Sequence, residues 1–211
     1  ALSIVGVSLV YVIGEWAVSR ARPDDEKWEG LGEVMFWCGH VGLAFTVVFH
    51  SAVAWFIPGE LLAAFRHFSG EGHTPWISTT VPALAALGYF WSAWRLQQSA
   101  WTFVAATATA WSVTEWLLSH HVRPGSWLIA AAVMALAFHA AGILLRKREE
   151  FGPALQSSGR VFAWIGFTCV VIACFGYSVF DQPVRVATTA GALLLAATFA
   201  ADAFHERTGP P

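Results

Sequence analysis

The chain has few charged side chains, and this scarcity excludes most classes of soluble protein. Only 12% of its 211 residues are Asp, Glu, Lys or Arg, whereas 56% are hydrophobic and 12 are tryptophans. This composition is typical of an integral membrane protein and not of a soluble domain with a large core. Strand-length segments of alternating polarity are missing, which argues against a β-barrel. We therefore expect an all-α, polytopic transmembrane helix bundle that forms a single domain over residues 1–211.

The sequence also lacks the patterns of common catalytic and nucleic-acid-binding sites. It contains no phosphate-binding glycine loop, nucleophile elbow, HExxH motif or paired-carboxylate constellation. The formal net charge is −2 and the basic residues form no stripe, so nucleic acid is not an expected partner. The three cysteines lie within apolar segments, which suits small buried hydrophobes better than a disulfide framework or a zinc site.

Seven apolar segments are each about the length of a membrane span, for which roughly 20 mostly apolar residues are needed. They cover residues 2–18, 34–57, 77–94, 100–119, 127–145, 161–180 and 184–204. The first segment has no basic residues before it and no clear cleavage site, so it is predicted to be a span and not a signal peptide. We expect about seven spans surrounded by the lipid bilayer.

Lysine and arginine are distributed unevenly between the connections. With seven spans, nine of the 12 basic residues fall on one side of the membrane and three on the other. Because cytoplasmic connections are richer in basic residues, we expect the N-terminus outside and the C-terminus in the cytoplasm. The nine are Arg20, Arg22, Lys27, Arg95, Arg146, Lys147, Arg148, Arg160 and Arg207, and the three are Arg66, Arg123 and Arg185.

The segment 34–57 carries His40 and His50 but no formally charged side chain. Ten residues on a helix correspond to about 15 Å of rise and about 80° of net rotation, so both rings can face the same half of the bundle. Gly39 and Gly42 flank His40 and leave a low surface for a flat macrocycle. Neutral imidazole is a good iron ligand, so the pair favours two stacked b-type haems. The alternative is that each histidine hydrogen-bonds a Ser, Thr or carbonyl of a neighbouring helix.

A second ligand for the haem at His40 is predicted from depth in the membrane. The second and fifth spans are antiparallel, and His139 lies at a similar distance from the cytoplasmic side as His40. His205, near the end of the last span, is a weaker competitor. Cations at the cytoplasmic end of the fifth span would offset the charge of the haem propionates. These cofactor-binding candidates are Arg146, Lys147 and Arg148.

The second haem would use His50 and a histidine at the outer side of the bundle. His120 and His121 follow the fourth span, and either lies at a suitable depth. His121 is 18 residues before His139, which is five helical turns, so both rings share one face if the helix stays regular.

The first two spans contain the sequences GEWAVSR and GHVGLAFTVVFHSAVAWFIP. They resemble the membrane cytochrome b subunit, the gamma subunit, of respiratory nitrate reductases and their relatives. The resemblance covers the first third of the chain and implies ligation of one or two haem b groups by His40 and His50, together with His139 and His121. It further implies electron transfer between quinone or quinol and partner redox subunits in a bacterial inner (plasma) membrane. That family has five spans, whereas seven are expected here.

Two other functions fit the same residues. The chain can be a haem-free multi-span scaffold or assembly subunit of a membrane complex, with its histidines hydrogen-bonded. A pigment-binding photosynthetic subunit, with histidine at chlorophyll magnesium, is the weaker possibility. The leading prediction is the b-type cytochrome subunit.

Overall fold

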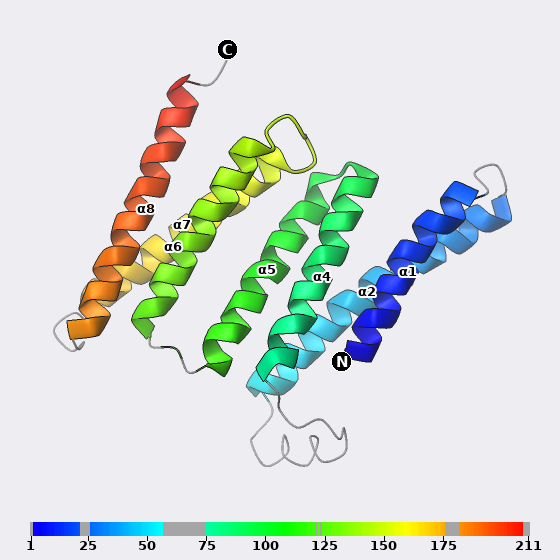
Figure 1. Cartoon of the computed structure of the whole chain (residues 1–211), viewed down its shortest axis with the longest axis horizontal. Coiled ribbons are helices and arrows are strands. Elements are labelled where there is room, and N and C mark those ends of the chain that lie inside the picture. Colours follow the sequence, from blue (N-terminus) through cyan, green and yellow to red (C-terminus); the bar gives the residue numbers. More distant parts are fainter. Residues whose placement is uncertain are drawn as a thin grey trace. The chain divides into compact units, whose positions relative to one another are not determined.

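The computed structural model describes residues 2–21, 26–56, 75–120, 122, 124–175 and 182–208, and every regular element among them is a helix (Figure 1). Each helix overlaps one predicted apolar segment, so the all-α bundle with about seven spans is confirmed. The helices are α1 (Leu2–Ala21), α2 (Glu26–Phe56), α4 (Pro75–Leu96), α5 (Ser99–Ser119), α6 (Pro124–Leu144), α7 (Gly152–Phe175) and α8 (Gln182–Thr208).

Two helices begin well before their apolar segments. Helix α2 starts at Glu26 and not at residue 34, and α7 starts at Gly152 and not at residue 161. Once a helix is nucleated, each added residue gains a backbone hydrogen bond, so the helix continues into polar sequence. At 31 residues, α2 is about 46 Å long, which exceeds the hydrocarbon thickness of about 30 Å. Hydropathy therefore identified the apolar parts of α2 and α7 but not the residues at which these two helices begin.

Three stretches of the described residues are long and apolar enough to cross a membrane, namely Leu2–Arg20, Gly30–Val48 and Ser126–Leu144. A shorter apolar stretch is Thr189–Ala200. Large apolar side chains on these helices are exposed, as at Val10, Val48 and Leu144. An exposed apolar side chain is stable in lipid, so these helices are compatible with a multi-pass membrane protein.

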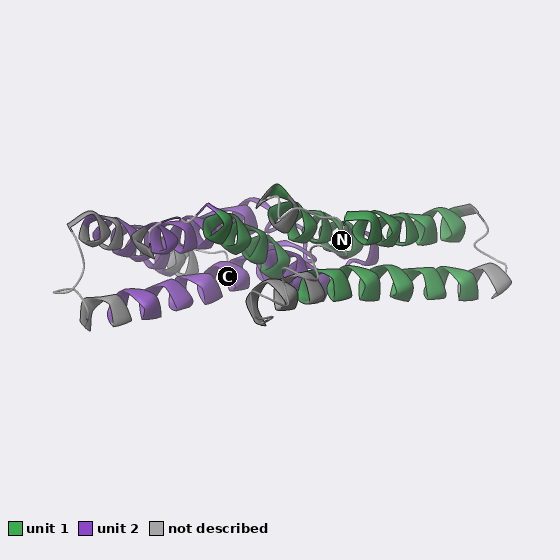
Figure 2. Ribbon diagram, turned by 90° about the horizontal axis from the view of Figure 1, so that it is seen from below, with its two compact units in different colours: residues 1–92, 107–119 green, residues 93–106, 120–211 purple. Residues whose placement is uncertain are grey.

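The helices are organised in two compact units (Figure 2). Unit 1 comprises residues 1–92 and 107–119, and unit 2 comprises residues 93–106 and 120–211. Within α4 and α5, the boundary between the units falls inside the helices.

In unit 1, α1 and α2 run antiparallel and touch at glycines (Figure 1). A Cβ atom added at Gly39 would lie 2.9 Å from the Ser8 carbonyl oxygen and 3.0 Å from the Val12 amide nitrogen. A Cβ at Gly42 would meet the Ser8 hydroxyl. Small residues allow this approach of two backbones, which is the usual basis of helix pairing in lipid.

In unit 2, α6 and α7 also come into close contact at glycines. A Cβ atom at Gly159 would lie 2.8 Å from the His139 amide nitrogen and 2.9 Å from the Ala135 carbonyl oxygen. A Cβ at Gly142 would lie 2.7 Å from the Gln156 amide nitrogen. The core of this unit joins α6, α7 and α8 through Ala132, Ala135, Ala163 and Leu195, with Phe162, Val170, Leu194 and Phe199 packed against them.

A tight turn joins α4 to α5. Gln97 adopts the left-handed conformation with φ of 55°, and the Gln98 amide donates to the Ala93 carbonyl oxygen at 3.4 Å. This six-residue closure is a Schellman cap, which satisfies a carbonyl group at the end of the helix. It lets α5 begin at Ser99, three residues after α4 ends.

The glycine contact between α1 and α2 predicts opposite effects for two substitutions on the same helix. Gly39→Ala forces the added methyl group against the α1 backbone, so it should lower the free energy of unfolding by about 1–3 kcal/mol. Gly30→Ala is the matched control, because nothing lies within 4 Å of its added Cβ. It should be neutral or stabilise by up to about 1 kcal/mol through helix propensity. Thermal unfolding of both variants in detergent measures this difference, and equal melting temperatures would contradict it.

Candidate functional site

His40 is a polar side chain buried inside unit 1, with 4% of its surface exposed. Its Nδ1 lies 2.7 Å from the Phe36 carbonyl oxygen, and its Nε2 lies 2.7 Å from the Ser92 hydroxyl oxygen. A carbonyl oxygen only accepts hydrogen bonds, so Nδ1 carries a proton and donates it. In the neutral ring Nε2 is then an acceptor, and it shares the single proton of the Ser92 hydroxyl with the Gly88 carbonyl oxygen, which lies 3.0 Å from that hydroxyl. The imidazole thereby bridges α2 and α4.

The surroundings of this bridge are closely packed. The Phe36 ring centroid lies 4.1 Å from that of His40, and the Tyr89 ring centroid lies 5.8 Å away. The Tyr89 hydroxyl donates to the His40 carbonyl oxygen at 3.4 Å. A Cβ atom at Gly88 would lie 3.0 Å from Leu43 Cδ1, so the α4 backbone comes close to α2 at the level of the bridge. We call His40, Ser92, Tyr89 and Gly88 the His40 bridge.

The immediate surroundings of His40 do not fit a haem in this arrangement. The two glycines that were expected to leave room for a macrocycle face α1, where Ser8 and Val12 cover them. The nitrogen that would bind iron is hydrogen-bonded to Ser92. Ligation of haem by His40 stays a prediction from the sequence, and it would require Ser92 to give up this bond.

His139 is buried in unit 2, with 1% of its surface exposed. Its backbone contacts Gly159 of α7, and its neighbour Phe138 stacks on Phe162 at 5.5 Å between ring centroids. His40 and His139 belong to different units, each of which is described by itself. The predicted pairing of these two histidines therefore stays a prediction.

The remaining predicted ligands are only partly described. His121 lies outside the described residues, and the side chains of His50 and His205 lie outside the described side chains. His120 is exposed in the turn after α5. Their proposed ligand roles stay predictions.

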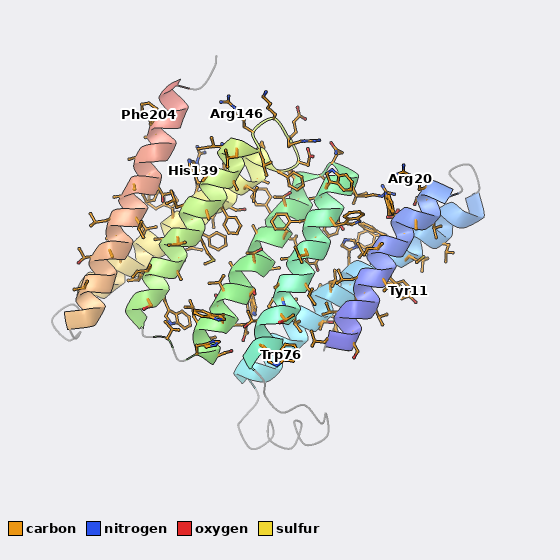
Figure 3. The ribbon with its side chains drawn as sticks, viewed as in Figure 1. Tyr11, Arg20, Trp76, His139, Arg146 and Phe204 are labelled. Atoms are coloured by element: carbon orange, nitrogen blue, oxygen red, sulfur yellow. The ribbon has the colours of Figure 1, made fainter. Side chains whose placement is uncertain are left out.

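The predicted propionate partners form a basic turn after α6. The side chains of Arg146, Lys147 and Arg148 are all exposed. Figure 3 shows Arg146 just beyond one end of α6, and His139 lies near the same end of that helix. Seven residues of helix correspond to about 10 Å, so this turn lies roughly two helical turns from His139. The basic side chains are accessible to an anion, and the identity of that anion stays a prediction.

No group of three or more His, Cys, Asp or Glu side chains that could hold a metal ion occurs among the residues the structure describes. Comparisons with protein-family models, with curated proteins and with solved structures find no match to this chain. The resemblance to the cytochrome b subunit of nitrate reductases thus stays a prediction from the residues that suggested it.

No pattern in the sequence indicated Ser92 as the partner of His40. The two residues are 52 positions apart, and serine is common in membrane helices. A general expectation was available, because an intramembrane histidine needs a hydrogen-bond partner on a neighbouring helix. The structure identifies the partner helix as α4 and the hydroxyl as that of Ser92, because α4 comes close to α2 at this level.

The His40 bridge predicts that Ser92→Ala lowers the free energy of unfolding by about 1–2 kcal/mol, because it leaves a buried ring nitrogen without its partner. Thr80→Val is the matched control on the same helix. It also removes a hydroxyl, but that hydroxyl donates only to the Trp76 carbonyl oxygen of its own turn. Thermal unfolding in detergent is the measurement.

A double variant makes the test specific to the pair. With His40→Leu in place, the additional Ser92→Ala change should cost much less than it does alone, since neither partner is then left unsatisfied. Additive losses would show that the hydrogen bond contributes nothing.

Proposed function

We propose that this chain is a haem-free, multi-span subunit that serves as a scaffold or assembly subunit of a membrane complex. The observation that carries the proposal is the His40 bridge, in which both ring nitrogens already have hydrogen-bond partners. Lipid tails are as apolar as leucine, so burying an apolar side chain between two helices gains little free energy in a bilayer. Interhelical hydrogen bonds of this kind therefore help to select which helices pair. On this view His40 has a structural role.

The exposed surface supports a place within lipid or a complex. Many large apolar side chains are exposed on both units, among them Val41 and Phe45 on α2 and Trp164 on α7. Side chains of this kind suit contact with lipid tails or with apolar surfaces of other subunits. The proposal assigns both kinds of neighbour to the chain.

A second candidate function is the b-type cytochrome subunit, which would pass electrons between quinone and partner redox subunits. Two observations favour it. His40 and His139 are both more than nine-tenths buried in apolar helices. The Nδ1–H of His40 is also held by a carbonyl oxygen, as it commonly is in metal-binding histidines, where Nε2 then faces the metal. A haem at His40 would have to replace Ser92 at that nitrogen.

The visible spectrum of the purified full-length protein separates the two candidates. We expect no Soret band and no reducible alpha band, even when the protein is made with haem supplied in excess. Haem b at a fixed stoichiometry, lost on His40→Ala while the protein stays inserted, would overturn the scaffold proposal and establish the cytochrome. Red absorption of a chlorophyll type would instead support the pigment-binding function.

We also propose that the N-terminus is outside and the C-terminus is cytoplasmic, because nine of the 12 basic residues then lie inside. With Cys38, Cys169 and Cys174 replaced by Ala, single cysteines at the exposed positions Gln98, Glu149 and His120 report the sides. In intact cells an impermeant maleimide should label His120→Cys only. Gln98→Cys and Glu149→Cys should react only after the membrane is opened. The reverse pattern would invert the orientation.

A further inference from the structure

The turn between α6 and α7 carries a concentrated positive charge on its surface. Arg146, Lys147 and Arg148 are consecutive and exposed. Of the two acidic residues that follow, Glu149 is exposed but Glu150 is buried, with 3% of its surface accessible. The carboxylate of Glu150 is thus withdrawn from direct contact with an approaching ligand. Three cations and one anion remain on the face of the turn.

The position of the turn places these charges at a membrane surface. It directly follows Ser126–Leu144, the most apolar of the candidate spans. Leu144 and Leu145, immediately before the basic residues, are 83% and 40% exposed. An apolar surface and a cationic surface are therefore adjacent along one segment of the chain. Phospholipids have the same order of an acyl chain and a charged headgroup.

Hydrogen bonds fix the backbone of the turn. The Arg148 amide donates to the Leu145 carbonyl oxygen at 2.8 Å, and the Gly152 amide donates to the Arg148 carbonyl oxygen at 2.8 Å. From α5, the buried Thr102 hydroxyl donates to the Glu150 carbonyl oxygen at 2.6 Å. A backbone that is ordered before binding loses less conformational entropy when a ligand arrives. The turn is accordingly a preformed platform for its three cations.

We propose that the α6–α7 turn binds the phosphate of an anionic phospholipid, with Arg146, Lys147 and Arg148 on the headgroup and Leu144 and Leu145 against its acyl chains. Guanidinium groups bind phosphate oxygens with two parallel hydrogen bonds, and the ammonium adds a point charge. Each such cation near an anionic lipid surface contributes roughly 1 kcal/mol, which is about a fivefold change in affinity. The proposal goes beyond the proposed function, and it assigns to these three cations a lipid phosphate in place of the haem propionates that were predicted from the sequence.

Native mass spectrometry of the detergent-solubilised full-length protein tests this site with phosphatidylglycerol as the probe and phosphatidylcholine as the zwitterionic comparison. We expect phosphatidylglycerol to be retained in preference to phosphatidylcholine and to raise the melting temperature. Replacing Arg146, Lys147 and Arg148 together by Gln should weaken phosphatidylglycerol binding by roughly 100-fold. Equal retention of the two lipids, or no loss in the triple variant, would overturn the proposal.

Two further variants separate charge from structure. Changing Arg146 and Arg148 to Lys keeps the charge and should keep most of the binding, so it remains informative even if the triple Gln variant does not fold. Glu149→Gln removes the exposed anion and should strengthen binding by roughly fivefold. No gain in Glu149→Gln, or loss of binding in the double Lys variant as large as in the triple Gln variant, would contradict a phosphate held by charge.

Phosphate compounds that lack acyl chains show whether the site binds a lipid or a soluble phosphate. Glycerophosphoglycerol and inorganic phosphate present the anion alone, and at equal ionic strength they should neither displace phosphatidylglycerol nor stabilise the protein. If either stabilises the protein as well as the lipid does, the site binds a soluble phosphate, and the lipid proposal is wrong.

Discussion

Contact between helix backbones at glycines is the constraint on which the rest of this structure depends. Lipid tails are as apolar as leucine, so helices in a bilayer gain little by burying apolar side chains and depend on close packing. Gly39 and Gly42 bring α1 against α2, and Gly142 and Gly159 bring α6 against α7. Successive residues on a helix differ by 100° in direction. Once Gly39 faces α1, the next residue must point elsewhere, and His40 points to α4.

The direction of His40 in turn decides its chemistry. A buried imidazole without partners would cost a few kcal/mol, so its two nitrogens need a donor and an acceptor within reach. The acceptor for Nδ1 is the Phe36 carbonyl oxygen, one turn earlier on the same helix, so this bond does not depend on a neighbouring helix. The Ser92 hydroxyl is available only because Gly88, one turn earlier on α4, lets the two helices approach. The polar bridge is thus a consequence of apolar packing.

Hydropathy alone predicted about seven spans, because a span must be long and apolar whatever it packs against. The starts of α2 and α7 were missed because backbone hydrogen bonding, and not hydropathy, extends a helix into polar sequence. The burial of His40 was predictable from its segment, and hydrogen bonding to a serine of a neighbouring helix was one of the two alternatives. Ser92 itself was not predictable, since nothing local in the sequence indicates which helix faces position 40. To predict which side chains meet across two helices, one must know how each helix is rotated about its axis relative to the other. The spacing of residues along one helix does not give this rotation.

The same rotation explains why small residues beside a histidine do not by themselves indicate a cofactor. Gly39 and Gly42 are three residues apart and lie on one side of α2, so a single neighbouring helix covers both. The residues that share the face of His40 are those three or four positions away, Phe36 and Leu43. Phe36 packs against the imidazole, and Leu43 is fully buried against Gly88. A macrocycle at His40 would therefore have to displace two large side chains, and the glycines would not make room for it.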